Sequence, residues 1–408
     1  DGHDLRARLR VQVAGRLVGQ HAVRLRDQGA GDGHTLAFAA RQLRRAMLQA
    51  VWFDAGPEQA GRLLLTIHHL SVDGVSWRIL VPDLAAAWQA AVDGQRPALP
   101  AKSSSFRRFA QRLAAHAQSP DVAAELPLWN AMQSAPALSL YDGALDARRD
   151  VAGTAGHVTL TLPDALTAAL LTRVPAAFHG GINDVLLTGL ALAVADWCRR
   201  HGRGVPSGHG SNGVDANGVG SNSHSSSGHG ASAAVLLDLE GHGREELFAD
   251  LDLSRTVGWY TSMFPLRLEL GGLDVESALR GSEGSARTQD RSSDRSLGRT
   301  LKSIKEQLRA LPNNGLGYGL LRYLNQETAA QLADHATPQI GFNYLGRVTA
   351  SDTADWSVAQ EDNVRLGGSD PRMPLGHCIE VNAHTLDSPE GSKLVADWAF
   401  APALIGED

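Results

Sequence analysis

Apolar positions along this chain follow two periods, and their order predicts a mixture of strands and helices. Short apolar or alternating runs predict strands. These runs lie at 9–13, 62–67, 157–162 and 233–239. Spacings of three and four residues predict amphipathic or buried helices. These segments lie at 39–47, 75–91, 105–132, 163–174 and 185–195. Elements of similar scale occur in both halves, which indicates an α/β protein of two lobes with a site between them.

Three details refine this pattern. The run 62–67, Arg-Leu-Leu-Leu-Thr-Ile, is mainly apolar and predicts a buried strand. Pro82 falls inside the helical segment 75–91, and a proline there removes a backbone donor and predicts a kink or a split. The aromatic and β-branched run 253–265 predicts a core strand over most of its length.

Composition shifts divide the chain. The stretch 134–156 contains proline, glycine and aspartate residues that are typical of loops, and it predicts a linker. We therefore expect a first lobe over 1–145 and a second lobe over 146–408. Two low-complexity segments, 202–232 and 281–296, predict disordered loops. The histidines of the first segment have no regular spacing or carboxylate partners, which favours a solvated insert over a metal site.

Charge and cysteine content narrow the class of protein. With 408 residues and 43% hydrophobic positions, the chain can bury one large core or two medium ones. A formal net charge of -6 argues against nucleic acid or an acidic membrane as partner. Cys198 and Cys378 cannot form a disulfide framework or a zinc site, so we expect a reducing, cytoplasmic setting. The apolar helix 185–195 is too short to cross a bilayer.

The string His68-His69-Leu70-Ser71-Val72-Asp73-Gly74 carries the first candidate chemistry. It delivers an imidazole, which titrates near neutral pH, to the end of a rigid strand with a carboxylate close by. The same string can equally be a structural turn whose histidines satisfy backbone groups.

Two further strings carry polar side chains at the ends of apolar runs. Glu240 follows the strand at 233–239 and precedes two glycines that permit close backbone approach. Arg255 begins the run at 253–265, where its guanidinium could hold Asp73 in a bidentate pair. By itself, Glu240 also fits an acidic residue in a surface turn, and the run 253–265 also fits a core strand.

Taken in order, five strings resemble the condensation superfamily of nonribosomal peptide synthetases, and within it the epimerization domains. They are HHLSVDGVSWRIL from His68, EGHGRE from Glu240, RTVGWYTSMFP from Arg255, GLGYGLLRYL from Gly315 and FNYLG from Phe342. The first string is shared across the superfamily, and the others point to the epimerization branch. Departures are Tyr260, where phenylalanine is more frequent, and Leu316, where isoleucine is common.

The resemblance implies two α/β lobes like chloramphenicol acetyltransferase, forming a V-shaped pseudodimer with an active-site tunnel between them. The chain begins at a point that resembles the inside of the first lobe. We therefore expect the family's opening strand and helix, and the final helix of the second lobe, to be missing.

The activity that the resemblance implies is inversion at the α-carbon of an aminoacyl or peptidyl thioester held on the phosphopantetheine arm of a carrier protein. Glu240 and His69 are the expected catalytic residues. Glu240 acts as base or acid on one face, and His69 serves the other face or stabilises the enolate oxygen. A dry tunnel should raise the pKa of the Glu240 carboxyl. The expected supporting residues are His68, packed inward, Asp73 and Gly74 in the turn, Arg255 as partner of Asp73, and Asn343 with Tyr344 along the tunnel.

No metal, flavin, nicotinamide or pyridoxal cofactor is implied, and the prosthetic arm comes from the carrier protein. Three alternatives differ in kind. A condensation domain would use the same histidine string to join two carrier-bound substrates, and a non-catalytic recruitment module would need none of the three residues His69, Asp73 and Glu240. A metal hydrolase is disfavoured because adjacent histidines in an extended chain point to opposite faces.

Overall fold

The computed structural model describes residues 48–54, 56, 61–203, 233–280, 291–349, 356, 370–388 and 390–406. The chain divides into two compact units, one drawn from 1–106 and 250–260 and the other from 107–249 and 261–408. The expected boundary at 145/146 is therefore wrong, because the helices after residue 106 pack with the second unit. The predicted strand at 9–13 and helix at 39–47 lie outside the described residues, as do residues 204–232 of the first insert.

In the first unit, the expected strand at 62–67 is confirmed. Strand β2, Arg62–Ile67, pairs antiparallel with β1, Leu48–Phe53. Its expected burial is wrong, since Leu63 and Leu64 remain 39% and 40% exposed. Within the described residues the sheet has only these two strands, and a two-stranded sheet buries little apolar surface.

Helix α3, Gly74–Val92, follows the histidine turn as one helix of 19 residues that includes Pro82. The predicted split at Pro82 is not found. The Pro82 side chain is exposed, so its ring lies on the outer face of the helix. The helix packs against the strands through Trp88, whose ring stacks on Trp52 with centroids 6.1 Å apart.

The run 253–265 is not the predicted core strand. Only its last four residues are in a strand, β5 Ser262–Glu269, and 250–260 is an irregular segment of the first unit. Its backbone donors bond to side chains instead: Arg255 N–H to Ser103 Oγ, and Gly258 N–H to Ser76 Oγ at 3.2 Å. Satisfying the donors in this way removes the need for a strand partner.

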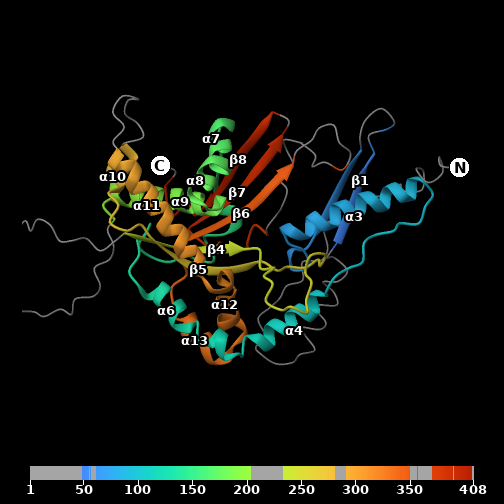
Figure 1. Cartoon of the computed structure of the whole chain (residues 1–408), viewed down its shortest axis with the longest axis horizontal. Helices are drawn as coiled ribbons and strands as arrows, with labels where there is room; N and C mark the ends of the chain where they lie inside the picture. The colour runs from blue at the N-terminus through green and yellow to red at the C-terminus, as the bar shows by residue number, and fades with distance from the viewer. Residues whose placement is uncertain are drawn as a thin grey trace, which may run out of the picture. The chain divides into compact units, whose positions relative to one another are not determined.

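The second unit is built on a mixed six-stranded sheet with the order β3-β8-β7-β6-β4-β5 (Figure 1). Its strands are β3 Gly156–Thr161, β4 Ala234–Gly241, β5 Ser262–Glu269, β6 Ile340–Thr349, β7 Ile379–Ser388 and β8 Gly391–Phe400. Strands β4, β6 and β7 run parallel, and the other pairs are antiparallel. The predicted strands at 157–162 and 233–239 are confirmed as β3 and β4.

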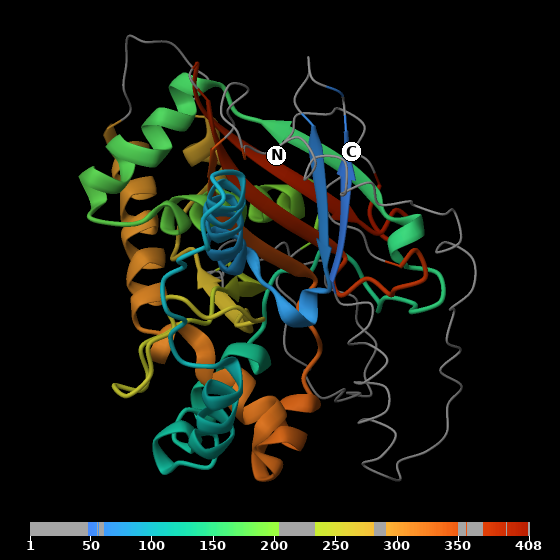
Figure 2. The same cartoon turned by 90° about the vertical axis from the view of Figure 1, so that its right-hand side faces the viewer.

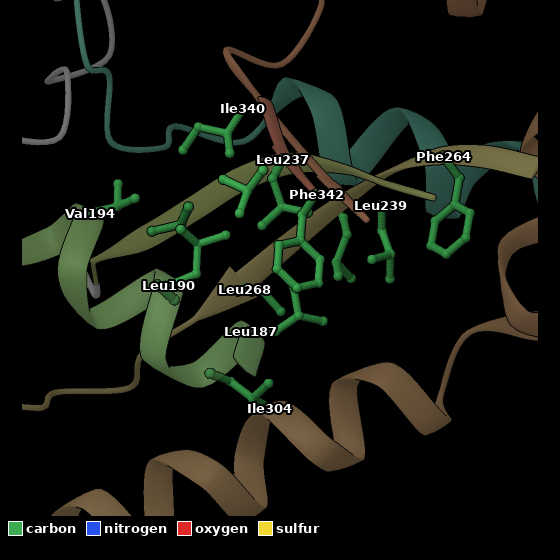
Figure 3. Packing of buried hydrophobic residues seen from close by; sticks show 14 of the residues in the cluster. Leu187, Leu190, Val194, Leu237, Leu239, Phe264, Leu268, Ile304, Ile340 and Phe342 are labelled. Carbon is green, nitrogen blue, oxygen red and sulfur yellow. The ribbon is translucent and has the colours of Figure 1, made fainter. Parts of the chain in front are cut away.

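Helices α9, Ile182–Arg200, and α11, Arg291–Arg309, cover one face of this sheet. Figure 3 shows Leu187 and Leu190 of α9 and Ile304 of α11 packed against apolar side chains of the sheet. In Figure 2 the orange helix α11 runs along one side of the strands. The predicted buried helix at 185–195 is confirmed. The expected loop at 281–296 is corrected, because 291–296 begin α11; residues 281–290 are outside the described part.

The remaining helical segments of the described chain are short. Before the sheet's first strand they are η1 His69–Ser71, α4 Phe106–His116, α5 Pro120–Ala123, α6 Leu126–Ser134 and η2 Ala152–Thr154. The others are α7 Asp164–Ala168, the π-helical η3 Ala169–Arg173, α8 Val174–Phe178, α10 Val275–Arg280, η4 Pro312–Gly315, α12 Leu316–Gly319, η5 Leu320–Leu324 and α13 Gln326–Ala333. The helical zone predicted at 105–132 thus divides into α4, α5 and α6.

The expected linker at 134–156 is part of the packed second unit. Leu140 and Tyr141 are buried in its core, and Leu138 N–H bonds to the Ala234 carbonyl of β4 at 2.8 Å. The segment therefore belongs to the fold despite its loop-like composition.

In the described residues no single helix is long and apolar enough to span a membrane. The helical segments 164–178 and 182–200 reach that length and apolarity only when they are taken together, and they are bent by 103° relative to one another.

Candidate active site

The histidine turn of the first unit follows directly from the end of β2. His68 caps η1, and its Nδ1 accepts a hydrogen bond from Leu70 N–H at 3.2 Å. The ring is thus hydrogen-bonded as expected, but His68 is exposed and not packed inward. The short cap fixes the ring beside the turn, where solvent still reaches it.

His69 is also exposed, and its ring lies against Trp259 with centroids 4.7 Å apart and planes tilted by 53°. Trp259 comes from the irregular segment 250–260, so the first and third sequence strings meet within one unit. An aromatic neighbour of this kind limits how the imidazole can turn. The geometry leaves the His69 ring accessible to a substrate.

Asp73 has a structural role, as expected, but its partners are Ser76 and Tyr260 and not Arg255. It is the N-cap of α3, with a carboxylate that accepts bonds from Ser76 N–H at 2.7 Å, Ser76 Oγ–H at 2.6 Å and Tyr260 N–H at 3.2 Å. Only 3% of Asp73 is exposed. A carboxylate at a helix N-terminus satisfies free backbone donors and interacts favourably with the helix dipole. Gly74 begins the helix in open space, and nothing in the described residues requires a glycine there.

The expected pairing of Arg255 with Asp73 is wrong. Arg255 Nη2 bonds instead to both carboxylate oxygens of Asp83, at 2.8 and 2.7 Å. Asp83 lies near the middle of α3, whereas Asp73 is already occupied by the amides at the helix start. Arg255 therefore ties the irregular segment to the side of the helix.

In the second unit, Glu240 lies in β4 and not in the turn after it. Strand alternation places Asp238 and Glu240 on the same face, because side chains two residues apart in a strand point the same way. The pairing of β4 with β6 sets Leu239 beside Phe342, and therefore Glu240 beside Asn343. Asn343 and Glu240 line one cleft, as the sequence predicts for a shared site.

Tyr344 lies on the opposite face of β6, so its expected place beside Asn343 is wrong. Its hydroxyl and that of Thr385 form a hydrogen bond at 2.8 Å, and its ring packs against the core. Neighbouring residues of a strand face opposite ways. Only one of Asn343 and Tyr344 can therefore line the cleft, and it is Asn343.

The pKa of the Glu240 carboxyl is raised from 4.5 to about 7. Burial is the larger cause, and the negative charge of Glu380 adds to it. The expected upward shift is thus confirmed. A carboxyl with this pKa is populated in both its protonated and its ionised form at neutral pH, which suits a general base or acid.

The cleft holds a second pair of titratable groups that the sequence did not reveal. His377 Nε2 and Asp238 Oδ2 are 2.9 Å apart, and both residues are buried. The imidazole lies over Gly341 of β6, where an added Cβ would come within 2.5 Å of Nδ1. The sequence could have indicated Asp238 as a cleft residue, because it stands two residues before Glu240 in the same strand. It gave no signal for His377, because this residue lies 139 positions after Asp238 in the chain.

The cleft is small. Its lining comprises Asp238, Glu240, Met263, Gly341, Phe342, Asn343, His377 and Glu380. About 10 Å³ is open, close to what a single water molecule needs. The cleft within the second unit is therefore too small to enclose a substrate.

A larger cavity of about 550 Å³ lies elsewhere in this unit. Glu245, from the same string as Glu240, lines it and accepts a hydrogen bond from Asn314 Nδ2 at 2.8 Å. The string that begins at Glu240 thus meets the residue just before the string that begins at Gly315, although Glu240 itself does not line this cavity. Within the described residues no group of three or more His, Cys, Asp or Glu side chains is arranged to hold a metal ion.

Comparisons with known proteins agree with this architecture. A model of the condensation-domain family matches residues 43–205. One of the linear gramicidin synthase proteins of Brevibacillus parabrevis is 35% identical over 366 residues, which cover 89% of this chain and 4% of that protein. A chondramide synthase from Chondromyces crocatus is 36% identical over 357 residues, covering 86% and 7%. The chain thus spans less than a tenth of the length of these relatives.

Solved structures show the same fold. The epimerization domain from the third module of tyrocidine synthetase B matches with a TM-score of 0.63 and 25% identity, over 93% of this chain and 74% of that one. The first condensation domain of the CDA synthetase matches with a TM-score of 0.50 and 17% identity, over 91% and 67%. The protein has the α/β fold of the condensation superfamily. Within that class, the chain belongs with the condensation-like domains of nonribosomal peptide synthetases.

Proposed function

We propose that the chain is an epimerization domain, which interconverts the L and D configurations at the α-carbon of an aminoacyl or peptidyl thioester. The observation that carries the proposal is the Glu240 carboxyl, with its pKa of about 7, on the cleft of β4. The likeness to the epimerization domain of tyrocidine synthetase B supports it.

The chemistry needs a base, an acid and a place for negative charge. When the Cα–H bond breaks, its electron pair moves onto the thioester carbonyl oxygen as an enolate, and a proton returns to the opposite face. Glu240 is the base or acid on one face, because its pKa lies near the working pH. His69 serves the other face or donates to the enolate oxygen. Asn343, which lines the cleft with Glu240, can donate an amide N–H to the substrate.

The substrate in this proposal arrives on the phosphopantetheine arm of a carrier-protein domain, and the partner is that carrier protein. The thioester carbonyl itself accepts the electron pair, so the reaction as proposed calls for no further organic cofactor or metal. The cytoplasmic setting expected from the cysteine content stays a prediction.

A condensation domain is the second candidate, and the family-model match to condensation domains favours it. Such a domain would form an amide bond between two carrier-bound substrates. It gives no role to a carboxyl of neutral pKa in this position, whereas α-proton exchange requires a base, which this carboxyl can supply.

The test is solvent exchange at the α-carbon. Carrier proteins loaded with a panel of L-aminoacyl and dipeptidyl thioesters are incubated with the chain in D₂O, and deuterium at Cα is measured by mass spectrometry after hydrolysis. We expect exchange with wild type and a loss of about 100-fold or more in Glu240→Gln. Asn343→Ala should slow exchange, while Tyr344→Phe, on the opposite face of β6, should not.

Absence of deuterium with every loaded carrier, together with amide formation when a second aminoacyl carrier is added, would establish the condensation activity instead. Undiminished exchange in Glu240→Gln would refute the role assigned to this carboxyl. Retained carrier binding in the variant, measured by calorimetry, separates loss of chemistry from loss of docking.

A further inference from the structure

The buried pair Asp238 and His377 lies in the same cleft as Glu240 and has no role in the reaction described above. Asp238 is two residues before Glu240 on the same face of β4. His377 comes from the segment that leads into β7 and bonds to Asp238 through Nε2 at 2.9 Å. Both line the cleft, and 7% of His377 and 8% of Asp238 are exposed.

The bond to Asp238 orients the imidazole. It holds a proton on Nε2, which leaves Nδ1 as the free nitrogen in the neutral ring. Nδ1 lies over Gly341, where the missing side chain leaves room for the ring. Within the described chain no residue forms a hydrogen bond to Nδ1, so this nitrogen can accept a proton from the cleft.

Inversion at carbon creates a need for such a group. When Glu240 takes a proton from one face and another residue returns one to the opposite face, Glu240 ends the turnover protonated. It must lose that proton before it can act again in the same direction. Glu240 lines a cleft in which only about 10 Å³ is open, so few water molecules reach its carboxyl directly.

We propose that His377, oriented by Asp238, carries the proton between Glu240 and solvent after each turnover. This inference rests on the proposed epimerase function. The proton leaves the Glu240 carboxyl and binds Nδ1 of the neutral ring, the resulting imidazolium is stabilised by the Asp238 carboxylate, and the proton is then released from Nδ1 to water. Glu240 returns to the carboxylate form, and no other bond changes.

Other groups around the cleft fit the relay less well. Tyr318 of α12 is not among the residues that line the cleft, and its pKa is raised to about 12 by burial and by the charge of Asp238, so it keeps its proton at neutral pH. Asn343 does not titrate. Glu380 of β7 is exposed and bonded to Asn382 Nδ2 at 3.3 Å, and its negative charge opposes proton loss from Glu240. Glu380 is the one competing relay among the described cleft residues, and the experiment includes it.

The test compares single and repeated turnovers in His377→Gln. With enzyme in excess over loaded carrier, each site reacts once and needs no reset, so we expect deuterium uptake within about twofold of wild type. With carrier in excess and little buffer, we expect epimerization to slow about tenfold or more, because proton transfer by a positioned group is lost. Added imidazole should restore the rate, since a small base can replace the missing ring.

Three variants control this result. Asp238→Asn should behave like His377→Gln but more mildly, since the ring remains without its orienting charge. His157→Gln, an exposed histidine on β3, should match wild type. Glu380→Gln removes a charge that raises the pKa of Glu240, so its absolute rate can change, but its rate should depend on buffer concentration no more strongly than that of wild type. Thermal unfolding of each variant establishes that it is folded.

A normal repeated-turnover rate at low buffer in His377→Gln would overturn the relay. So would an equal loss in single turnovers that imidazole does not relieve, because that pattern means a structural role. A buffer-dependent loss in Glu380→Gln alone would assign the relay to that carboxyl instead. If wild type and His157→Gln both fail to exchange, the epimerase function itself is wrong, and the relay is refuted with it.

Discussion

At the scale of single residues, Glu240 is held in a place that disfavours its charge. Burial and the nearby Glu380 raise the pKa of its carboxyl to about 7, while the unfolded chain has the ordinary value of 4.5. Between pH 4.5 and about pH 7, the folded state therefore binds one more proton at this carboxyl than the unfolded state does. By linkage, wild-type stability falls as pH rises from about 4.5 to about 7. The reactive carboxyl thus lowers the folding free energy available at neutral and higher pH.

Glu240→Gln should remove this penalty. We expect the variant to gain up to about 3 kcal/mol of unfolding free energy relative to wild type at pH 8, since each pKa unit corresponds to about 1.4 kcal/mol. The gain should fade as pH falls towards 4.5, where wild-type Glu240 is protonated. Urea unfolding at pH 5 and pH 8 measures both differences. Glu380→Gln should show a smaller gain in the same direction, and an identical difference at both pH values would contradict the assignment.

At the scale of elements, two carboxylates stabilise α3 in different ways: Asp73 caps its first turn, and Asp83 near its middle pairs with Arg255. Asp73 caps the first turn and also accepts the Tyr260 N–H, both in buried surroundings. Arg255 and Asp83 join the irregular segment to the helix at a half-exposed position, with 30% and 25% of their side chains accessible. Buried caps contribute more to stability than half-exposed ion pairs.

We therefore expect Asp73→Ala to destabilise the first unit by about 2–3 kcal/mol, because it removes a cap and leaves a buried donor unsatisfied. Arg255→Ala should cost about 1 kcal/mol or less. Amide hydrogen exchange along α3 measures the two effects separately from the second unit. Equal or greater protection loss in Arg255→Ala would show that the ion pair, and not the cap, holds this helix.

At the scale of the whole molecule, the two units bury apolar side chains to different degrees. Leu237 of β4 is fully buried between the sheet and its helices, whereas Leu64 of β2 is 40% exposed. The same truncation should therefore have unequal consequences. Leu237→Ala should cost about 2–5 kcal/mol of unfolding free energy.

Leu64→Ala, the matched variant, should cost less than about 1 kcal/mol, because it removes little buried surface. Urea unfolding followed by tryptophan fluorescence compares the two proteins. A cost for Leu64→Ala as large as that for Leu237→Ala would mean that β2 is buried under an additional layer in solution.

Sequence patterns predicted several elements of both units, since the periods of two and about 3.6 residues are local properties. They identified β2, β3, β4 and the buried helix α9, and they singled out Glu240. They failed at 253–265, where β-branched and aromatic residues favoured a strand. Side chains distant in sequence, such as Asp73 and Ser76, supply the hydrogen bonds there instead.

The sequence by itself therefore determined which residue types end each strand, and so where an acid, a histidine and a capping carboxylate can stand. Only the tertiary structure decided their partners. Asp238 meets His377 because β4, β6 and β7 are neighbours in one sheet, and Gly341 of β6 leaves space between them. Asn343 and Tyr344 separate because strand pairing, and not adjacency along the chain, selects the face each side chain uses.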